Sequence, residues 1–229
     1  MQPEVEIFRP PRLSRASGRL ACLLGSFDPV HRGHQFMMRE LLRRADALLV
    51  LLPARHFDKE VVPGKNAGFE QRLDMLRLLP SVLGDVIGLG LAHEVLFLRL
   101  ASALEQRFPG IELCFGMGND TFGRLLDSAS YYRRWGLDWN PREERALAAL
   151  RKTAVVFGRS SRETGMVAVP DQLSPVSSTL VRARASELFD RGAGQAEWQR
   201  TLDWAVESRV VEYLAGHGIY RGQAPPFAV

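Results

Sequence analysis

Long apolar runs, cysteines and lysines are all scarce in this chain of 229 residues. No apolar run approaches the roughly 20 residues that a helix needs to cross a bilayer, and the segment from Met1 to Arg19 lacks the apolar centre of a signal peptide. The two cysteines, Cys22 and Cys114, each lie inside an apolar run, which predicts buried free thiols rather than a disulfide or a metal pair. These features together predict a cytoplasmic protein with no membrane segment.

Lysine accounts for only three of the 30 basic residues, so arginine carries nearly all the positive charge of a chain whose formal net charge is +4. Arginine suits bidentate binding of phosphate, although a general bias toward arginine explains the same composition. The chain has no dense basic run interleaved with aromatic residues, so nucleic-acid binding is not indicated. Nothing in the sequence indicates an oligomeric state.

Apolar runs alternate with amphipathic segments along most of the chain. Buried strands are predicted at 20–24, 47–52, 111–116 and 153–158, with shorter strands within 82–91 and at 166–169. Helices are predicted at 69–79, 94–108 and 120–126, and again toward the end of the chain, where Val206, Val210, Tyr213 and Leu214 share a face. The alternation predicts an α/β fold, a Rossmann-like doubly wound parallel sheet followed by a C-terminal helical segment.

One domain is predicted over residues 19–222. Residues 1–18 are polar and include two adjacent prolines, which predicts a loose lead-in, and residues 223–229 are predicted to be a mobile tail. Residues 136–152 interrupt the alternation with a short helix of their own. We therefore expect this segment to be an insertion on the surface of the domain.

The most informative segment runs from Gly25 to His34, with the sequence Gly-Ser-Phe-Asp-Pro-Val-His-Arg-Gly-His. It lies between the strand at 20–24 and an amphipathic helical pattern that starts near His31. Residues three apart share a helix face, so His31 and His34 are expected side by side. The first turn of a helix also offers unpaired N–H groups and the positive end of its dipole. Two imidazoles at such an end form a site for phosphate oxygens.

A second segment, Val176-Ser177-Ser178-Thr179-Leu180-Val181-Arg182, also opens a predicted helix. Ser177 can cap that helix and leave its first-turn N–H groups facing an anion. Ser178 and Arg182 stand four residues apart on one face, so hydroxyls, amides and a guanidinium can converge on phosphate oxygens. The alternative is an ordinary capped helix with an exposed arginine.

These two segments resemble the motifs of a known family. The first resembles the G-[ST]-F-[DN]-P-x-H-x-G-H signature of the HxGH nucleotidyltransferases, and the second resembles the family's I-S-S-T-x-[IV]-R motif with Val176 in place of Ile. Among these enzymes the chain looks most like the bacterial nicotinate or nicotinamide mononucleotide adenylyltransferases. The resemblance implies transfer of an adenylyl group from ATP to a phosphorylated small-molecule acceptor. Mg²⁺ is expected to come with the nucleotide, because the sequence shows no dedicated carboxylate cluster.

The resemblance also implies roles for individual residues. His31, His34 and Arg182 would act on the phosphates during transfer, with backbone contacts to the nucleotide from Gly25, Ser26 and Phe27. Further nucleotide contacts are implied for Lys65, Gly118, Asp120, Arg159, Ser177, Ser178 and Thr179. Alternatives stay open at three of the positions concerned: Lys59 competes with Lys65, Asp120 is equally consistent with a helix cap, and Arg72, which follows Lys65, is consistent with a structural ion pair.

The likeness is weak over 83–108 and 128–152, where the acceptor is expected to bind. Ala92-His93-Glu94-Val95 stands where relatives carry small hydroxyl residues, and Tyr131, Tyr132 and Trp135 lie near an expected Trp without matching it in register. Nicotinate or nicotinamide mononucleotide is therefore the first expectation for the acceptor, and pantetheine phosphate or a sugar or alcohol phosphate is the second. A nucleotide-binding sensor without turnover is the alternative from another functional class.

Overall fold

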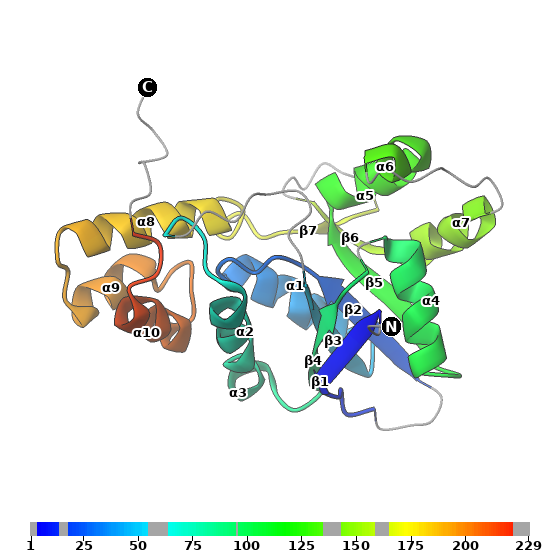
Figure 1. Ribbon diagram of the computed structural model, residues 1–229, viewed down its shortest axis with the longest axis horizontal. Helices are drawn as coiled ribbons and strands as arrows, with labels where there is room; N and C mark the ends of the chain where they lie inside the picture. The colour runs from blue at the N-terminus through cyan, green and yellow to red at the C-terminus, as the bar shows by residue number, and fades with distance from the viewer. Residues whose placement is uncertain are drawn as a thin grey trace.

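The computed structural model describes residues 4–13, 18–54, 64–94, 96–134, 143–158 and 165–221. Within these residues the strands form one seven-stranded sheet with the order β1-β4-β3-β2-β5-β6-β7 (Figure 1). The strands are β1 (Val5–Arg9), β2 (Arg19–Leu24), β3 (Ala47–Pro53), β4 (Ile87–Ala92), β5 (Glu112–Gly118), β6 (Val155–Gly158) and β7 (Val167–Ala168). All neighbouring pairs are parallel except β1 with β4. The predicted α/β doubly wound sheet is confirmed.

The strand order reverses beside β2, which lies between β3 on one side and β5 on the other. In open α/β sheets the ligand binds outside the carboxyl ends of the strands at such a reversal, because the loops there diverge to opposite faces. The segment from Gly25 to His34 begins in the loop that follows β2 and ends in the first turn of the next helix, and β5 ends at Gly118. The topology therefore brings two predicted site segments to one crevice.

Helices cover both faces of the sheet (Figure 1). One core joins the sheet to α1 (Arg32–Leu42), α2 (Phe69–Arg77), α3 (Pro80–Leu83), α8 (Ser178–Asp190), α9 (Gln195–Leu202) and α10 (Ser208–His217). The second core joins the other face to α4 (Phe97–Arg107), α5 (Asn119–Leu126), α6 (Ser128–Arg134) and α7 (Glu144–Thr153). Among the described residues, no helix combines the length and the apolar character needed to span a bilayer.

The two cysteines lie in adjacent strands but belong to different cores. Cys114 is paired in register with Ala21 and packs in the first core, whereas Cys22 packs in the second core on the opposite face. Both are buried free thiols, as predicted. Because successive side chains of a strand point to opposite faces, the two sulfur atoms are separated by the sheet itself.

The expected loose lead-in over residues 1–18 is wrong for residues 5–9, which form β1. This strand pairs antiparallel with β4, with Val5 opposite Ala92. Val5 and Ile7 pack against the second core, whereas Glu4 and Glu6 alternate with them on the exposed side. The period-two pattern of a half-buried edge strand explains the pairing, and the polar residues that form half of this pattern suggested a loop.

The surface insertion expected at 136–152 is also wrong where the structure describes it. Leu147 and Leu150 of α7 are 1% and 6% exposed and belong to the second core. The connection from β5 to β6 must cross over one face of the sheet because the two strands are parallel neighbours. This crossover contains α5, α6 and α7, so α7 belongs to the layer of helices that covers this face of the sheet. Residues 135–142 and the expected tail at 223–229 lie outside the described residues.

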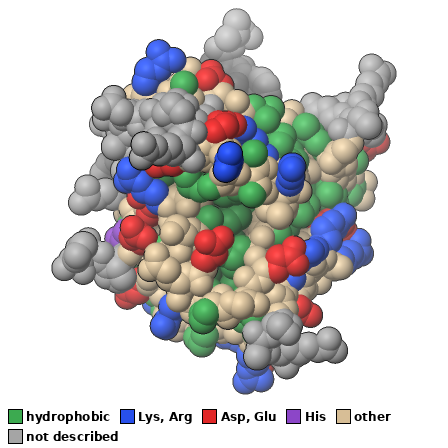
Figure 2. Space-filling view, turned by 90° about the vertical axis from the view of Figure 1, so that its right-hand side faces the viewer, with side chains coloured by type: hydrophobic (Ala, Val, Ile, Leu, Met, Phe, Trp, Pro, Cys, Tyr) green, Lys and Arg blue, Asp and Glu red, His purple; other side chains and the backbone are tan. Residues whose placement is uncertain are grey.

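The side of the molecule formed by α4 and α7 is hollowed between these two helices. A pocket of about 600 Å³ lies there over β5, with small side chains such as Ala101 and Ala149 on its helical walls. Figure 2 views the molecule from the right-hand side of Figure 1, where both helices lie, and shows apolar side chains in the middle of this face with charged ones around them.

Candidate functional site

His31 and His34 hydrogen-bond to each other's backbone at the start of α1. His31 is the N-cap residue, and its Nδ1 accepts the N–H of His34 at 3.3 Å. In return, the Nδ1 of His34 accepts the N–H of His31, also at 3.3 Å. The two rings are stacked with their centroids 3.7 Å apart. Because both Nδ1 atoms act as acceptors, a neutral ring at either position carries its proton on Nε2 and presents a donor there.

Gly33 and Phe27 support this pair of rings. A Cβ atom at position 33 would lie 3.0 Å from Cε1 of His31, so glycine leaves the room that the ring occupies. Phe27 is 1% exposed and meets His34 edge to face at 5.0 Å. Its backbone has a φ of 46°, a left-handed conformation that non-glycine residues adopt rarely and that persists only when the surroundings impose it. The burial of the Phe27 ring is what imposes it here.

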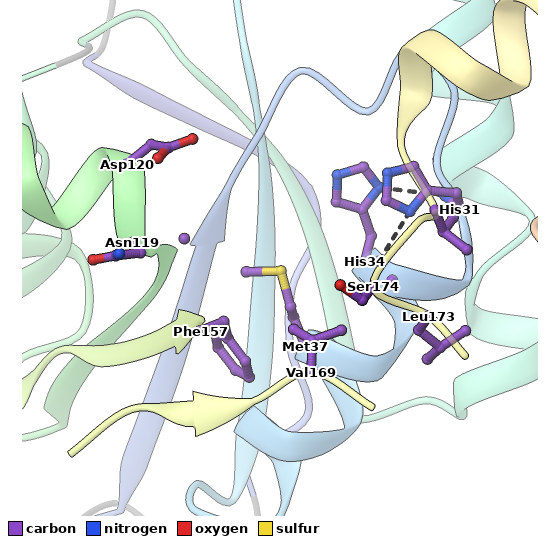
Figure 3. A pocket seen from close by; sticks show the side chains of 12 residues that line it. His31, His34, Met37, Asn119, Asp120, Phe157, Val169, Leu173 and Ser174 are labelled. Atoms are coloured by element: carbon purple, nitrogen blue, oxygen red, sulfur yellow. Dashed lines mark hydrogen bonds between the residues drawn. The ribbon is translucent and has the colours of Figure 1, made fainter. Parts of the chain in front are cut away.

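Both histidines line a pocket of about 380 Å³ at the carboxyl end of the sheet. Figure 3 shows His31 and His34 on one side of this pocket and Asn119 and Asp120 on the other, with Met37, Phe157 and Val169 between them. A Cβ atom at Gly118 would meet nothing within 4 Å, so the backbone at the end of β5 borders open space. The pocket therefore combines a mostly apolar floor with polar groups from α1 and α5.

The second motif docks its helix against the first motif. Ser177 caps α8 by accepting the N–H of Leu180 at 3.2 Å, as predicted. The hydroxyl of Ser178 donates to the carbonyl oxygen of Pro29 at 3.1 Å. Val176, the residue before the cap, lines the same pocket as His31. Two motifs that are far apart in the sequence thus lie side by side at the carboxyl end of the sheet.

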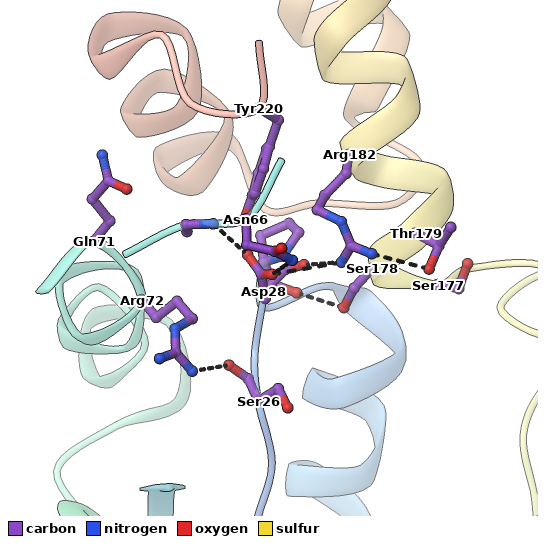
Figure 4. A network of polar contacts seen from close by, with 12 residues as sticks. Ser26, Asp28, Asn66, Gln71, Arg72, Ser177, Ser178, Thr179, Arg182 and Tyr220 are labelled. Atoms are coloured by element: carbon purple, nitrogen blue, oxygen red, sulfur yellow. Dashed lines mark hydrogen bonds and ion pairs between the residues drawn. The ribbon is translucent and has the colours of Figure 1, made fainter. Parts of the chain in front are cut away.

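Arg182 makes the strongest link between the two motifs. Its Nη1 donates to the backbone carbonyl oxygen of Asp28 at 2.7 Å and lies 3.7 Å from the Asp28 carboxylate, whereas its Nη2 donates to the hydroxyl of Thr179 at 3.2 Å (Figure 4). The Arg182 side chain is 14% exposed. The alternative of an ordinary exposed arginine is therefore wrong, because the guanidinium is held between α8 and the loop after β2.

Asp28 is a functional candidate for which the motif alone suggested no role. Its carboxylate accepts hydrogen bonds from Asn66 Nδ2 at 2.7 Å, from the N–H of Ala67 at 2.9 Å and from the hydroxyl of Tyr220 at 2.8 Å. Asp28 is 4% exposed, and a buried carboxylate is tolerated only when it is hydrogen-bonded or paired. Its place inside the signature and the place of Tyr220 just after the last helical pattern were the only signals in the sequence.

The loop before α2 contributes structural contacts. Lys65 is exposed and is not among the residues that line the pocket with His31, whereas its neighbour Asn66 reaches Asp28. Arg72 is 3% exposed and donates to the carbonyl oxygen of Ser26 at 3.3 Å. Burial lowers the pKa of Arg72, and the nearby Asp28 carboxylate opposes that shift. Arg72 therefore supports the loop after β2 from inside the fold.

Arg159 and Lys59, which were candidates for nucleotide contacts, lie outside the described residues, as do Val95 and Trp135 from the segments where the acceptor is expected to bind. The same holds for the side chain of Tyr131.

Two of the residues that depart from the family pattern have structural roles. Tyr132 is 2% exposed and donates to Glu143 at 2.6 Å, so it belongs to the core between α6 and the start of α7. Glu94 accepts the N–H of Leu96 at 2.8 Å just before α4.

The part of the chain that the structure describes holds no group of three or more His, Cys, Asp or Glu side chains arranged to bind a metal ion. The polar side chains that line the pocket are the imidazoles of His31 and His34, together with Asn119, Asp120 and Ser174. The two imidazoles can donate through Nε2, and such donors suit an anion, a phosphorylated ligand in particular.

Comparison with known proteins decides the family. The sequence profile of cytidylyltransferase-like proteins matches residues 22–184, which is well over half of the chain and includes both motifs. The chain belongs to the cytidylyltransferase-like family. The resemblance of the motifs to the HxGH nucleotidyltransferases is thereby confirmed, and the fold of this family accounts for the strand order described above.

Individual relatives agree with this assignment to the cytidylyltransferase-like family. A Gloeobacter violaceus protein described as a probable nicotinate-nucleotide adenylyltransferase is 28% identical over 88% of this chain and 96% of its own length. A Stenotrophomonas maltophilia protein of the same description is 27% identical over the same shares. The solved structure of Plasmodium falciparum nicotinic acid mononucleotide adenylyltransferase complexed with NaAD has a TM-score of 0.60, covers 88% of this chain and 97% of that chain, and is 14% identical. This structural likeness establishes the fold.

Proposed function

We propose that the protein transfers the adenylyl group of ATP to nicotinate or nicotinamide mononucleotide, which gives a dinucleotide and pyrophosphate. The observation that carries the proposal is the meeting of the two motifs, in which Arg182 and Ser178 bond to the carbonyl oxygens of Asp28 and Pro29 beside the paired histidines. The names of the relatives, which match nearly the whole chain, support the choice of acceptor.

In the proposed reaction, a phosphate oxygen of the acceptor attacks the α-phosphorus of ATP in line. A new bond forms between that oxygen and the α-phosphorus, and the bond from the α-phosphorus to the bridging oxygen of the β-phosphate breaks. Pyrophosphate leaves with the electron pair of the broken bond. No covalent enzyme intermediate is needed, so catalysis consists of positioning the two substrates and stabilising the charge on the transferring group.

The geometry supports a role for each polar group. The Nε2–H donors of His31 and His34 suit α- and β-phosphate oxygens, because the reciprocal backbone bonds have already fixed both rings. Arg182 and the first turn of α8 suit the β- and γ-phosphates. The apolar floor between Met37 and Phe157 suits the adenine ring, and Gly118 and Asp120 at the far wall suit the ribose.

Mg²⁺ is proposed to arrive with the triphosphate of ATP. This fits the side chains that line the pocket, where the exposed Asp120 supplies the one carboxylate beside two imidazoles, Asn119 and Ser174. Mg²⁺ retains several waters and is commonly bound through substrate phosphates. When bound in this way, the ion neutralises phosphate charge, and the protein's own residues align the chain of phosphates.

The acceptor is tested by measuring pyrophosphate release from ATP and Mg²⁺ with a panel of phosphorylated compounds. Release is expected only when an acceptor is present, with nicotinate or nicotinamide mononucleotide among the best. Release with pantetheine phosphate but with neither mononucleotide would keep adenylyl transfer and overturn the acceptor. Tight ATP binding without release across the panel would overturn the activity and favour a nucleotide sensor.

A further inference from the structure

The buried carboxylate of Asp28 connects three segments that lie far apart in the sequence. Figure 4 shows the donors that surround it: Asn66 and Ala67 from the loop before α2, and Tyr220 from the segment after α10. Each donor is within 2.9 Å of a carboxylate oxygen. Such a set of bonds leaves the side chain of Asp28 little freedom to rotate.

Asp28 in turn fixes Arg182. The guanidinium bonds to the backbone carbonyl oxygen of Asp28 at 2.7 Å, and its Nη1 lies 3.7 Å from Oδ2 of the same residue. The latter distance is too long for a hydrogen bond, so the carboxylate attracts the Arg182 guanidinium without being hydrogen-bonded to it. The direct donors to the carboxylate are the neutral groups from the other two segments.

Tyr220 is the most distant of those donors in the sequence. It is 1% exposed, and its backbone has a φ of 69°, which is a rarely populated left-handed conformation for a residue other than glycine. The preceding turn at Gly218 is left-handed as well. The chain therefore turns sharply after α10, and this turn places the Tyr220 hydroxyl against Asp28.

We propose that Tyr220 is a positioning residue for adenylyl transfer, which acts by holding the Asp28 carboxylate so that the Arg182 guanidinium stays available to the triphosphate. The inference rests on the proposed function. Without the hydroxyl, Oδ1 of Asp28 keeps only the N–H of Ala67 as its donor, and the loss of a partner at a buried carboxylate is costly. The Arg182 guanidinium, whose Nη1 lies 3.7 Å from Oδ2 of the same carboxylate, is close enough to compensate for the lost bond by moving toward that oxygen. Arg182 then turns toward the carboxylate and away from the phosphates.

The test is the variant Tyr220→Phe, with Tyr213→Phe as the matched control. Tyr213 also lies at the C-terminal end of the chain, and its hydroxyl donates to Asp74 at 3.0 Å, which joins α10 to α2 without involving Asp28. Both variants remove one hydroxyl from one bond to a carboxylate. We expect Tyr220→Phe to lower kcat/KM for ATP about tenfold and Tyr213→Phe to leave it within about twofold. Equal effects of the two variants would overturn the proposal.

A double-mutant cycle separates positioning from general structural support. In an Arg182→Lys background the Tyr220→Phe change is expected to cost little further activity, because its effect passes through the guanidinium. The same loss in both backgrounds would overturn the proposal. If Tyr220→Phe does not fold, Asn66→Ala removes another donor to the same carboxylate. This variant is expected to give the same non-additive cycle with Arg182→Lys, and an additive result would overturn the proposal.

Failure of the positioning role can be distinguished from failure of the proposed function. If the wild-type protein transfers no adenylyl group to any acceptor, the proposed function is wrong. The coupling between Tyr220 and Arg182 is then measured as affinity for a nonhydrolysable ATP analogue by calorimetry. Non-additive losses of affinity in the same cycle support the positioning role, and additive losses or none contradict it.

Discussion

The Nδ1 atoms of His31 and His34 each accept the backbone N–H of the other residue, at 3.3 Å in both directions. This reciprocal bond does two things at once. It satisfies N–H groups that the start of α1 would otherwise leave unpaired, and it fixes two stacked rings with the Nε2 atoms as donors. The helix cap and the proposed phosphate site are therefore formed by the same two residues.

Replacing His34 by Ala should lower kcat far more than it weakens ATP binding. A donor aimed at charge that develops during transfer acts mainly in the transition state, so we expect a loss of roughly 10² or more in kcat. Steady-state kinetics measures the effect, and His217→Ala, an exposed histidine near the end of α10, serves as the control. A turnover within a few-fold of wild type would show that His34 has no such role. His31→Ala should lose turnover similarly.

The change Gly33→Ala should lower turnover without lowering stability in proportion. Alanine is favoured over glycine inside a helix by roughly 0.5–1 kcal/mol, but its Cβ would lie 3.0 Å from the His31 ring and must displace it. Gly123→Ala in α5 is the control, since a Cβ there meets nothing within 4 Å. Unfolding in urea and kcat are measured together. Unchanged kcat in Gly33→Ala would mean that the exact ring position is unimportant.

Arg182→Lys should be poorly tolerated. The guanidinium bonds to Asp28 and Thr179 with two different nitrogens, and a single ammonium group cannot reproduce that fork. We expect kcat/KM for ATP to fall at least about tenfold. Arg184→Lys is the matched control on the same helix, because Arg184 is exposed and pairs only with Glu187 among the described contacts. Equal kinetics for both variants would contradict the role of Arg182.

The helix α7 should contribute to stability. Leu147→Ala removes a side chain that is 1% exposed in the second core, which typically costs about 2–5 kcal/mol of unfolding free energy. Arg145→Ala changes an exposed residue of the same helix and should cost no more than about 0.5 kcal/mol. Urea denaturation compares the two variants. A similar small effect for both would mean that α7 is an addition to the surface after all.

The sequence predicts those parts of the fold that rest on local patterns. Strands β2 and β3 are continuous apolar runs, as parallel strands buried on both faces must be, and they were placed within one or two residues. The strand β1 was missed because it pairs antiparallel at the edge of the sheet, and only Val5 and Ile7 face the core. The pattern of α7 was recognised as helical, but a single amphipathic helix does not reveal which surface covers its apolar side.

The candidate site likewise has parts that local sequence patterns predict and parts that they do not. The histidine pair and the cap at Ser177 follow from local spacing at two helix starts. The bond between Tyr220 and Asp28 spans nearly the whole chain, and no local pattern encodes a contact between residues so far apart. The role of Asp28 as an acceptor for three segments therefore required the three-dimensional arrangement. The resemblance supplied the meeting of the two motifs, which neither motif implies alone.

The central claim is that the protein moves the adenylyl group of ATP directly onto the phosphate of a pyridine mononucleotide. The most direct measurement follows a label placed in the α-phosphate of ATP during incubation with Mg²⁺ and nicotinate or nicotinamide mononucleotide. The label is expected in a dinucleotide product, and a label in the γ-phosphate is expected in pyrophosphate. Transfer of the γ-label to the acceptor, or release of the α-label as free AMP with no dinucleotide, would contradict the claim.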